Sequence, residues 1–505
     1  MIRVRAPEIP AQFDWLNAEQ PALSLKALRG YVILLEFWTY GCINCLHVIP
    51  DLKYLEQKYG DRLIVIGVHT AKFDHENHPD SIQQAVLRYG ISHPVVIDRD
   101  RHLWDQYTVK AYPTVVVIDP QGYIAGTIVG EGQRQRLETL IQQVLHAHDG
   151  KEMLPDASLQ LTLQPPQTPP LSPLAFPGKV ITDEESHLLC IADTGHHRLV
   201  ITTLDGALKA VIGTGEAGRL DGAWAVAQFA APQGMAFDRQ KQVLYVADTG
   251  NHQLRCVDLS AQTVSTIAGT GSQSQWLFPH GGKALDLDLN SPWDVVQRED
   301  RLYVAMAGSH QIWVMDLLEH TLQTWMGTGA EFCVDGSPEV AAFAQPSGLA
   351  MHTDEIFVAD SEVSSIRGVA IQNVPVARTV CGSGQLFDFG DRDGIGSVVR
   401  LQHCLGIVYA AGFLWVADTY NHKIKQINPT TGECLTIAGS GISDLRNGTG
   451  IDTAFAEPSG VTYARQHLFV ADTNNHAVRQ IHLKSLEVST LEIPTLCSPY
   501  VCLPA

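Results

Sequence analysis

Two cysteines separated by two residues are the part of this 505-residue chain best suited to chemistry. They are Cys42 and Cys45, and they come just after the apolar run Val32 to Trp38, where a buried strand is expected to pass into a helix. The thiolate form of cysteine attacks disulfides, and the free N–H groups and the dipole at a helix N-terminus lower the pKa of a cysteine placed there. We therefore predict that Cys42 is a nucleophile. Cys45, one turn further on and more interior, would resolve the mixed disulfide.

Alternating strand and helix patterns surround this pair over residues 1–150. Apolar and alternating runs predict strands at residues 32–38, 63–69, 95–97, 114–118 and 123–128. Apolar residues at helical spacing predict helices after Cys45 and between Leu137 and Leu145, and a third helix with Ser81 as its N-cap. The pattern indicates an α/β sandwich built on a small central sheet.

This segment resembles the thioredoxin family. Pro50, five residues after Cys45, corresponds to the proline that kinks the active-site helix in that family. Tyr112-Pro113-Thr114 resembles the cis-proline loop that lies against the active cysteines. The resemblance implies that Pro113 orients the backbone of a substrate for strand-like pairing.

Glu36 lies six residues before Cys42, where thioredoxins hold a buried acid. The resemblance implies a buried carboxyl group with a raised pKa that relays a proton to or from Cys45. The alternative interpretation is a partly solvated acid at a strand end. The candidate catalytic residues are therefore Cys42, Cys45, Pro113 and Glu36.

The stretch Phe37 to Cys45 is similar to TlpA- and DipZ-type thioredoxin-like domains, which share its Phe-Trp-Thr-Tyr-x-Cys-x-Asn-Cys pattern. It departs from ordinary thioredoxin because Gly41 precedes the nucleophile and Ile43-Asn44 replaces Gly-Pro. The dipeptide between the cysteines tunes the redox potential, so the direction of the reaction stays open.

A proline-rich stretch follows at residues 151–173, and we interpret it as a linker. Prolines at this density disfavour helix and central strand and stiffen the connection. Leu159, Leu161 and Leu163 alternate with polar residues inside it and could form a strand that closes the ring of the next domain.

Residues 174–505 repeat a motif of the form Val-Ala-Asp-Thr-x-Asn-His. Six copies place equivalent residues at positions 193, 248, 306, 360, 418 and 472. Each copy reads as four short antiparallel strands, and in several copies Pro-x-Gly opens the first of them. Four such strands make one blade of a β-propeller. The motif resembles the NHL repeat, which predicts a six-bladed NHL β-propeller after the thioredoxin-like domain. The whole arrangement resembles the family of NHL-repeat-containing protein 2 and its bacterial relatives.

Charge and composition exclude several partners. The net charge of -19 counts against binding of nucleic acids or anionic membranes. There is no apolar run of transmembrane length, and the segment Met1 to Pro7 does not read as a secretory signal, so we expect a cytoplasmic protein. A trimmed precursor would look the same.

Two sets of residues have competing interpretations. His47 and His69 could be acid–base partners, but we interpret them as solvated surface residues. The repeated Asp and His residues could ring a metal site, but Asp, Thr and Asn commonly bond local backbone at tight turns. Met306 and Ser364 also break the pattern. We therefore expect a structural role, with no metal and no cofactor.

The sequence predicts a thiol–disulfide oxidoreductase. Its partners would be a protein thiol or disulfide substrate, an unidentified reductant, and a protein or peptide at the propeller face. The alternative is a binding scaffold with a redox-inert thioredoxin fold. A third hypothesis, a metal-dependent enzyme built on the propeller, has no isolated cluster of His and carboxylates to support it.

Overall fold

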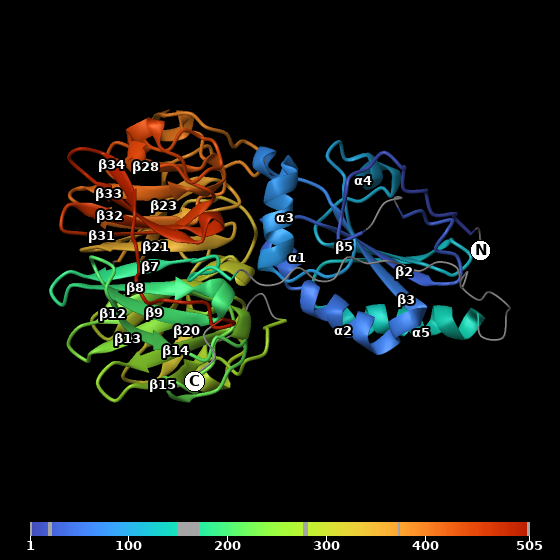
Figure 1. Ribbon diagram of the computed structural model, residues 1–505, viewed down its shortest axis with the longest axis horizontal. Helices are drawn as coiled ribbons and strands as arrows, with labels where there is room; N and C mark the ends of the chain where they lie inside the picture. Colours follow the sequence, from blue (N-terminus) through green and yellow to red (C-terminus); the bar gives the residue numbers. More distant parts are fainter. Residues whose placement is uncertain (1–2, 19–22, 149–170, 276–280, 372–373, 502–505) are drawn as a thin grey trace. The chain divides into compact units, whose positions relative to one another are not determined.

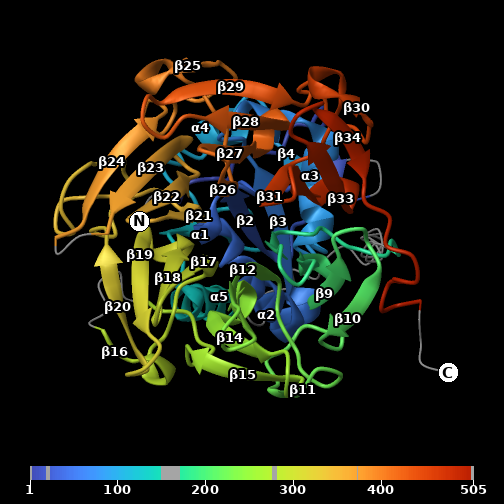
Figure 2. The same cartoon turned by 90° about the vertical axis from the view of Figure 1, so that its left-hand side faces the viewer.

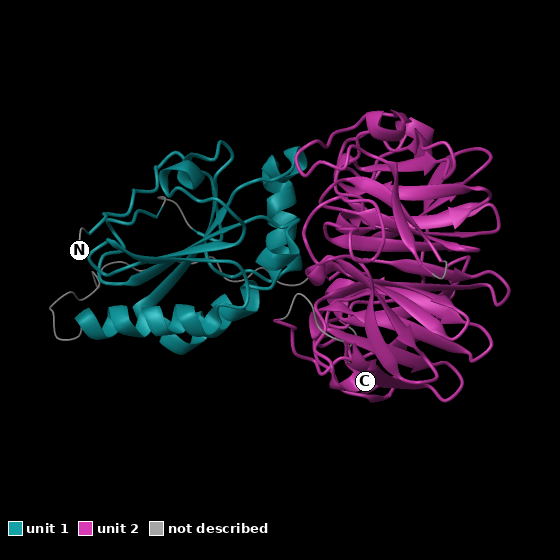
Figure 3. Cartoon of the chain, turned by 180° about the vertical axis from the view of Figure 1, so that it is seen from behind, with its two compact units in different colours: residues 1–168 teal, residues 169–505 magenta. Residues whose placement is uncertain are grey.

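The computed structural model describes residues 3–18, 23–148, 171–275, 281–371 and 374–501. The chain divides into two compact units, residues 1–168 and 169–505 (Figure 3). The expected linker and its alternating leucines fall mostly on residues 149–170, outside the described residues, so they stay predictions. No helix in the described ranges has the length and apolar character needed to cross a membrane.

The first unit is built on a six-stranded sheet in the order β1-β4-β3-β2-β5-β6. Figure 1 labels its strands β2, β3 and β5. Its strands are β1 (Trp15–Leu16), β2 (Val32–Trp38), β3 (Leu63–His69), β4 (Val95–Ile97), β5 (Thr114–Ile118) and β6 (Ile124–Val129). Strands β2, β3 and β4 run parallel, and β5 and β6 continue the sheet antiparallel. The apolar runs read from the sequence thus coincide with the observed strands, because these strands are covered on both faces.

Five helices accompany the sheet. They are α1 (Ile43–Leu46), α2 (Ile49–Tyr59), α3 (Pro79–Arg88), α4 (His102–Gln106) and α5 (Arg134–His148). Two residues separate α1 from α2, and Pro50 lies in the first turn of α2, where its missing N–H costs nothing. The expected cap at Ser81 was wrong, because α3 begins two residues earlier at Pro79 with His78 as its N-cap.

Each face of this sheet carries its own core. On one face Leu34, Leu52 and Ile141 join β2 to α2 and α5. On the other face Leu35 and Trp104 belong to a core that includes α4 and the segment before β2. Glu36 and Trp38 follow Leu34 at alternate positions of β2, so they share its face, beneath α2.

The second unit is a six-bladed β-propeller (Figure 2). Its blades are β7–β10 (residues 180–212), β12–β15 (232–268), β17–β20 (292–326), β21–β24 (346–381), β26–β29 (406–438) and β31–β34 (458–490). The first strand of each blade is innermost, and six such strands contact their neighbours around an axis. Two-residue strands in four of the connections pair with the outermost strand of the following blade: β11 (Gly222–Ala223), β16 (Gly282–Lys283), β25 (Gly394–Ile395) and β30 (Gly448–Thr449).

Among the described residues, the ring closes by packing of the last blade on the first. Val180 and Leu189 of the first blade share a core with Phe469 of the last. The backbone N–H of Phe176 donates to Nδ1 of His476 at 3.1 Å, and Oγ of Ser459 donates to the carbonyl of Gly178. The first and last blades each contain four strands of their own.

The repeated histidines join each blade to the next. Nδ1 of His197, His252, His310 and His422 accepts a backbone N–H from the following blade at 3.0–3.1 Å. Ser364, the exception in the repeat, accepts the N–H of His403 through its hydroxyl. The histidines therefore act as structural acceptors, and Ser364 replaces one without loss of the bond.

The repeated aspartates hold the turns. In the last blade both oxygens of Asp472 are used: one accepts the backbone N–H of Ala456 at 2.7 Å, the other accepts from Asn475 and Arg479 at 2.8 Å. Asp248, Asp360 and Asp418 are bonded in similar ways. In the third blade Met306 replaces the aspartate and Trp313 the basic residue, so a buried apolar pair stands where other blades hold an ion pair.

Candidate functional site

Cys42 is the N-cap residue of α1, and Cys45 lies within the helix. The backbone N–H of Cys45 donates to the carbonyl of Cys42 at 3.0 Å, which closes the first turn. The Cys42 side chain keeps slight exposure, at 7% for the residue, whereas Cys45 is fully buried. Both are free thiols, and of the two only Cys42 keeps any exposed surface.

Cys45 holds its proton firmly. Burial raises the pKa of the Cys45 thiol well above its usual range, and the hydrogen bond with Cys42 and the nearby charges of Cys42 and Glu36 act in the same direction. A protonated Cys45 can donate to a Cys42 thiolate and so stabilise it. The helix α1 has only four residues, so its contribution to Cys42 is confined to the free N–H groups of the first turn.

Glu36 is fully buried on β2, as expected from its position before the cysteines. Burial, and secondarily the negative charge of Glu56, raises the pKa of the Glu36 carboxyl to about 8. Neither of its oxygens has a hydrogen-bond partner within the described residues. A carboxyl group with a pKa near neutrality can both take and give a proton.

The peptide bond between Tyr112 and Pro113 is cis. The hydroxyl of Tyr112 donates to the carbonyl of Thr70 at 2.8 Å, and its ring packs against Trp104 with centroids 4.4 Å apart. Burial comes first in raising the pKa of Tyr112, and the charges of Cys45 and Cys42 add to it. The loop that carries Pro113 therefore lies near the two cysteines.

Glu76 is a site residue that the sequence did not reveal. It lies in a short 3-10 helix, Asp74–Asn77, and is fully buried. Its Oε1 accepts the backbone N–H of Gly41 at 3.0 Å, and Oε2 accepts those of Lys72 and Phe73 at 2.6 and 3.0 Å. Burial raises the pKa of this carboxyl, and these hydrogen bonds oppose the rise. Glu76 thus anchors the loop that leads into Cys42.

The prediction that His47 and His69 are solvated was wrong. His69 is 1% exposed, stacks on Tyr40 with ring centroids 5.5 Å apart and meets Trp38 edge-on. Burial lowers its pKa to about 3, so it is neutral at pH 7. The side chain of His47 is 7% exposed and its Nδ1 contacts Oε2 of Glu131. Trp38 and Tyr40 cover the His69 ring, and Glu131, which follows β6, contacts the His47 ring.

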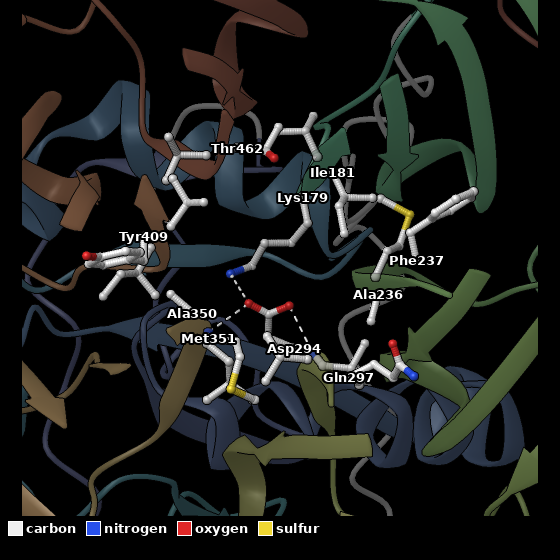
Figure 4. Close-up of a pocket in the computed structure, with 18 residues that line it drawn as sticks. Lys179, Ile181, Ala236, Phe237, Asp294, Gln297, Ala350, Met351, Tyr409 and Thr462 are labelled. Carbon is white, nitrogen blue, oxygen red and sulfur yellow. Dashed lines mark hydrogen bonds and ion pairs between the residues drawn. The ribbon is translucent and has the colours of Figure 1, made fainter. Parts of the chain in front are cut away.

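The axis of the propeller holds a cavity of about 240 Å³ lined by its innermost strands (Figure 4). Lys179 extends into it and donates to Oδ2 of Asp294 at 3.1 Å and to the carbonyls of Ser347 and Leu405 at 2.8 and 2.6 Å. The other blades have glycine at the equivalent positions: Gly234, Gly348, Gly406 and Gly460. All three N–H groups of Lys179 are used within the fold, so the side chain joins inner strands of different blades as a structural element.

Metal ligands are not gathered anywhere in the described part of the chain: no three His, Cys, Asp or Glu residues there could hold one ion. Eight described cysteines are free, six of them in the propeller. Cys497 is disulfide-bonded, and Cys502 lies outside the described residues.

Fold and site together define a thioredoxin-like domain joined to an NHL-repeat propeller. The thioredoxin-like family model matches residues 30–124, and the NHL repeat model matches residues 229–257 and 455–481. NHL repeat-containing protein 2 of Bos taurus is 40% identical over 517 residues, covering 96% of this chain and 71% of the relative. The chain belongs to this family of NHL repeat-containing proteins.

Other relatives share all or part of the chain. Protein SUPPRESSOR OF QUENCHING 1, chloroplastic, of Arabidopsis thaliana is 42% identical over 96% of this chain, which spans about half (47%) of that protein. The thiol-disulfide oxidoreductase YkuV of Bacillus subtilis is 26% identical over 28% of this chain and 96% of its own length. Protein DipZ of Mycobacterium tuberculosis is 35% identical over 31% of this chain and 23% of its own length. The predicted likeness to the family and to DipZ-type domains is therefore confirmed.

Proposed function

We propose that this chain is a thiol–disulfide oxidoreductase that uses Cys42 and Cys45. The observation that carries the proposal is the burial of a proton-holding Cys45 behind Cys42, with Glu36 beneath them. A thioredoxin-like fold in this family and the name of the YkuV relative support it.

The reaction follows from this geometry in two steps. The thiolate of Cys42 attacks one sulfur of a substrate disulfide, which forms a mixed disulfide and releases the other sulfur as a thiolate that takes a proton from solvent. Cys45 then passes its proton to the ionised form of Glu36 and attacks the Cys42 sulfur of the mixed disulfide, which forms the Cys42–Cys45 disulfide and releases the second substrate sulfur as a thiolate that takes a proton from solvent. The substrate is reduced by two electrons, and an external dithiol must reduce the pair again.

Pro113 is assigned the role of presenting the backbone beside it to the substrate. The loop that carries it is fixed by Tyr112, whose hydroxyl donates to Thr70, and by the backbone N–H of Gly130, which donates to the carbonyl of Pro113 at 2.9 Å. A fixed loop next to the nucleophile can align an extended substrate with little loss of entropy.

The experiment that tests this proposal is trapping with Cys45→Ser. The variant lacks the resolving thiol, so Cys42 should stay joined to substrate proteins in mixed disulfides that reductant releases. Cys42→Ser is the matched control and should trap none. Absence of trapped species together with absence of insulin reduction by the wild-type chain would rule the proposal out.

We assign partner recognition to the propeller. The connections between blades carry exposed apolar side chains at similar places, among them Leu220, Phe332, Phe387 and Ile442. Exposed apolar residues repeated around a rigid ring suit a protein or peptide partner. The cytoplasmic location stays a prediction; the name of the Arabidopsis relative places that protein in the chloroplast.

The second candidate function is a binding scaffold whose thioredoxin fold does no redox chemistry. The match to NHL repeat-containing protein 2 favours a scaffold as much as an oxidoreductase, because the matched region includes the propeller. A chain with both Cys42→Ser and Cys45→Ser separates the two. It would keep every partner and every activity if the scaffold role were the whole function.

A further inference from the structure

The helix that carries the cysteines is tied at its end to the loop that follows β6. His47 is the C-cap residue of α1, and its backbone N–H donates to the carbonyl of Ile43 at 3.1 Å. Nδ1 of its ring contacts Oε2 of Glu131, which lies between β6 and α5. The His47 side chain is 7% exposed and that of Glu131 is 21% exposed, so water competes little for the contact.

The residue before Glu131 holds the loop of Pro113. The backbone N–H of Gly130 donates to the carbonyl of Pro113 at 2.9 Å, and Val129 pairs with Thr114 in the sheet. Gly130 has a φ of +88°, in the left-handed region that favours glycine, so the chain turns sharply here. Consecutive Cα atoms are about 3.8 Å apart, which leaves little slack between the two contacts. One short loop therefore binds the cysteine helix through Glu131 and the proline loop through Gly130.

Two further charged side chains lie beside this contact. Nη1 of Arg134, the first residue of α5, is 3.4 Å from Oδ1 of Asp51 in the first turn of α2. Burial raises the pKa of the Asp51 carboxyl; the charges of Arg134 and His47 oppose the rise, and that of Glu131 adds to it. The four side chains thus interact with one another and join the beginnings of α2 and α5.

The spacing between Cys42 and Pro113 matters if the chain works as proposed above. An extended substrate would pair with the backbone beside Pro113 while its disulfide meets the Cys42 sulfur, so both elements must be held at a fixed separation. In the sheet, Phe37 on β2 pairs with Thr114 on β5, which sets this separation where the strands end. The contact between His47 and Glu131 joins the segments that continue beyond β2 and β6.

We propose that His47 and Glu131 are positioning residues that fix the cysteine helix against the Pro113 loop and so align protein disulfides for attack by Cys42. The inference rests on the proposed oxidoreductase function and adds the pair that favours extended protein substrates. A small disulfide meets Cys42 without pairing to the backbone beside Pro113. Its reduction therefore depends less on the spacing that the pair maintains.

The test compares two substrates of the full-length chain, with an external dithiol as the electron source. One is insulin, a protein disulfide, and the other is a small aromatic disulfide that releases a coloured thiolate. In His47→Ala and in Glu131→Ala, kcat/KM for insulin should fall by about 10²-fold, the loss that a misplacement of about 1 Å causes, and the loss with the small disulfide should be about tenfold smaller.

The double variant should lose no more than either single variant, because the two side chains act as one unit. Glu131 is the more exposed of the two, so Glu131→Ala keeps the test interpretable even where His47→Ala folds poorly.

Lys58→Ala and Glu138→Ala are the matched controls, because this pair also joins α2 to α5 but lies in the last turn of α2, at the end opposite the cysteines. Both should keep the wild-type ratio of the two kcat/KM values. An unchanged ratio in both His47→Ala and Glu131→Ala would overturn the inference, as would full additivity of their losses. A wild-type chain that reduces neither substrate would instead defeat the proposed function, so the two failures are distinguishable.

Discussion

The backbone N–H of Gly41 donates to Oε1 of Glu76 at 3.0 Å, so the residue before the nucleophile is tied to a buried carboxyl group 35 positions further along the chain. The same carboxyl group accepts the N–H groups of Lys72 and Phe73. One side chain therefore joins the loop before Cys42 to the loop after β3, and this sets where the thiol can lie.

Replacement of Glu76 should disturb both stability and the nucleophile. Glu76→Ala leaves three backbone N–H groups without their acceptor, and at about 1–3 kcal/mol for an unsatisfied buried donor, with some relaxation, we expect a loss of about 2–4 kcal/mol. Chemical denaturation measures it, and the alkylation rate of Cys42 should fall in the folded variant. Glu76→Gln keeps one acceptor oxygen, so its free energy of unfolding should lie between those of the wild-type chain and Glu76→Ala. Equal stability of all three chains would refute the anchoring role.

Glu36 should make the thioredoxin-like unit less stable as the pH rises. Its folded pKa is about 8 against 4.5 when exposed, so between these values the unfolded chain loses a proton that the folded chain keeps. The free energy of unfolding therefore falls from pH 4.5 to pH 8 and then levels, by an amount on the order of 3–5 kcal/mol. Glu36→Gln should remove this slope in denaturation measured at pH 5, 7 and 9. A slope that persists in the variant would assign it to another group.

The apolar pair of the third blade gives a double-mutant test. Met306→Asp alone buries a carboxylate without a basic partner and should cost about 3–5 kcal/mol. Addition of Trp313→Arg supplies the partner found in other blades, and part of the loss should return. Thermal unfolding of the full chain measures both. The double variant could instead be no more stable than Met306→Asp, or less stable by the full loss that Trp313→Arg causes alone. Either result would refute the equivalence of these two positions with Asp472 and Arg479.

Partner binding by the propeller can be separated from thiol chemistry. Leu220→Ser, Phe332→Ser and Ile442→Ser, combined in a Cys45→Ser chain, should reduce the yield of trapped partner proteins several-fold. The reaction of Cys42 with a small disulfide reagent should be unchanged, because these residues belong to the other unit. Undiminished trapping would place recognition outside these connections.

The sequence predicted what depends on local pattern. Residues 32–38 and 63–69 were read as buried strands because apolar runs covered on both faces leave an unbroken signal. The burial of Glu36 was expected from the resemblance to thioredoxins, which hold a buried acid six residues before the first cysteine. The cis bond before Pro113 came from a family resemblance rather than from spacing.

Contacts between distant residues were missed. Glu76 reaches Gly41 only because the loops that follow β2 and β3 meet at the carboxyl end of these strands, and no local pattern marks it. Lys179 and Asp294 are 115 residues apart and meet only once six blades close a ring. A comparison of the six equivalent positions would have found that pair, since the other four are glycine. His69 was expected to be a solvated surface residue, yet Tyr40 and Trp38 cover it.

The most direct measurement of the central claim is the rate at which each active-site cysteine is alkylated as a function of pH. The account predicts that Cys42 is alkylated at neutral pH, that Cys45 stays unreactive until the chain unfolds, and that mild oxidation joins the two and abolishes the reaction of Cys42. A Cys42 that reacts no faster at pH 7 than an exposed model thiol, in a chain that forms no Cys42–Cys45 disulfide, would contradict it.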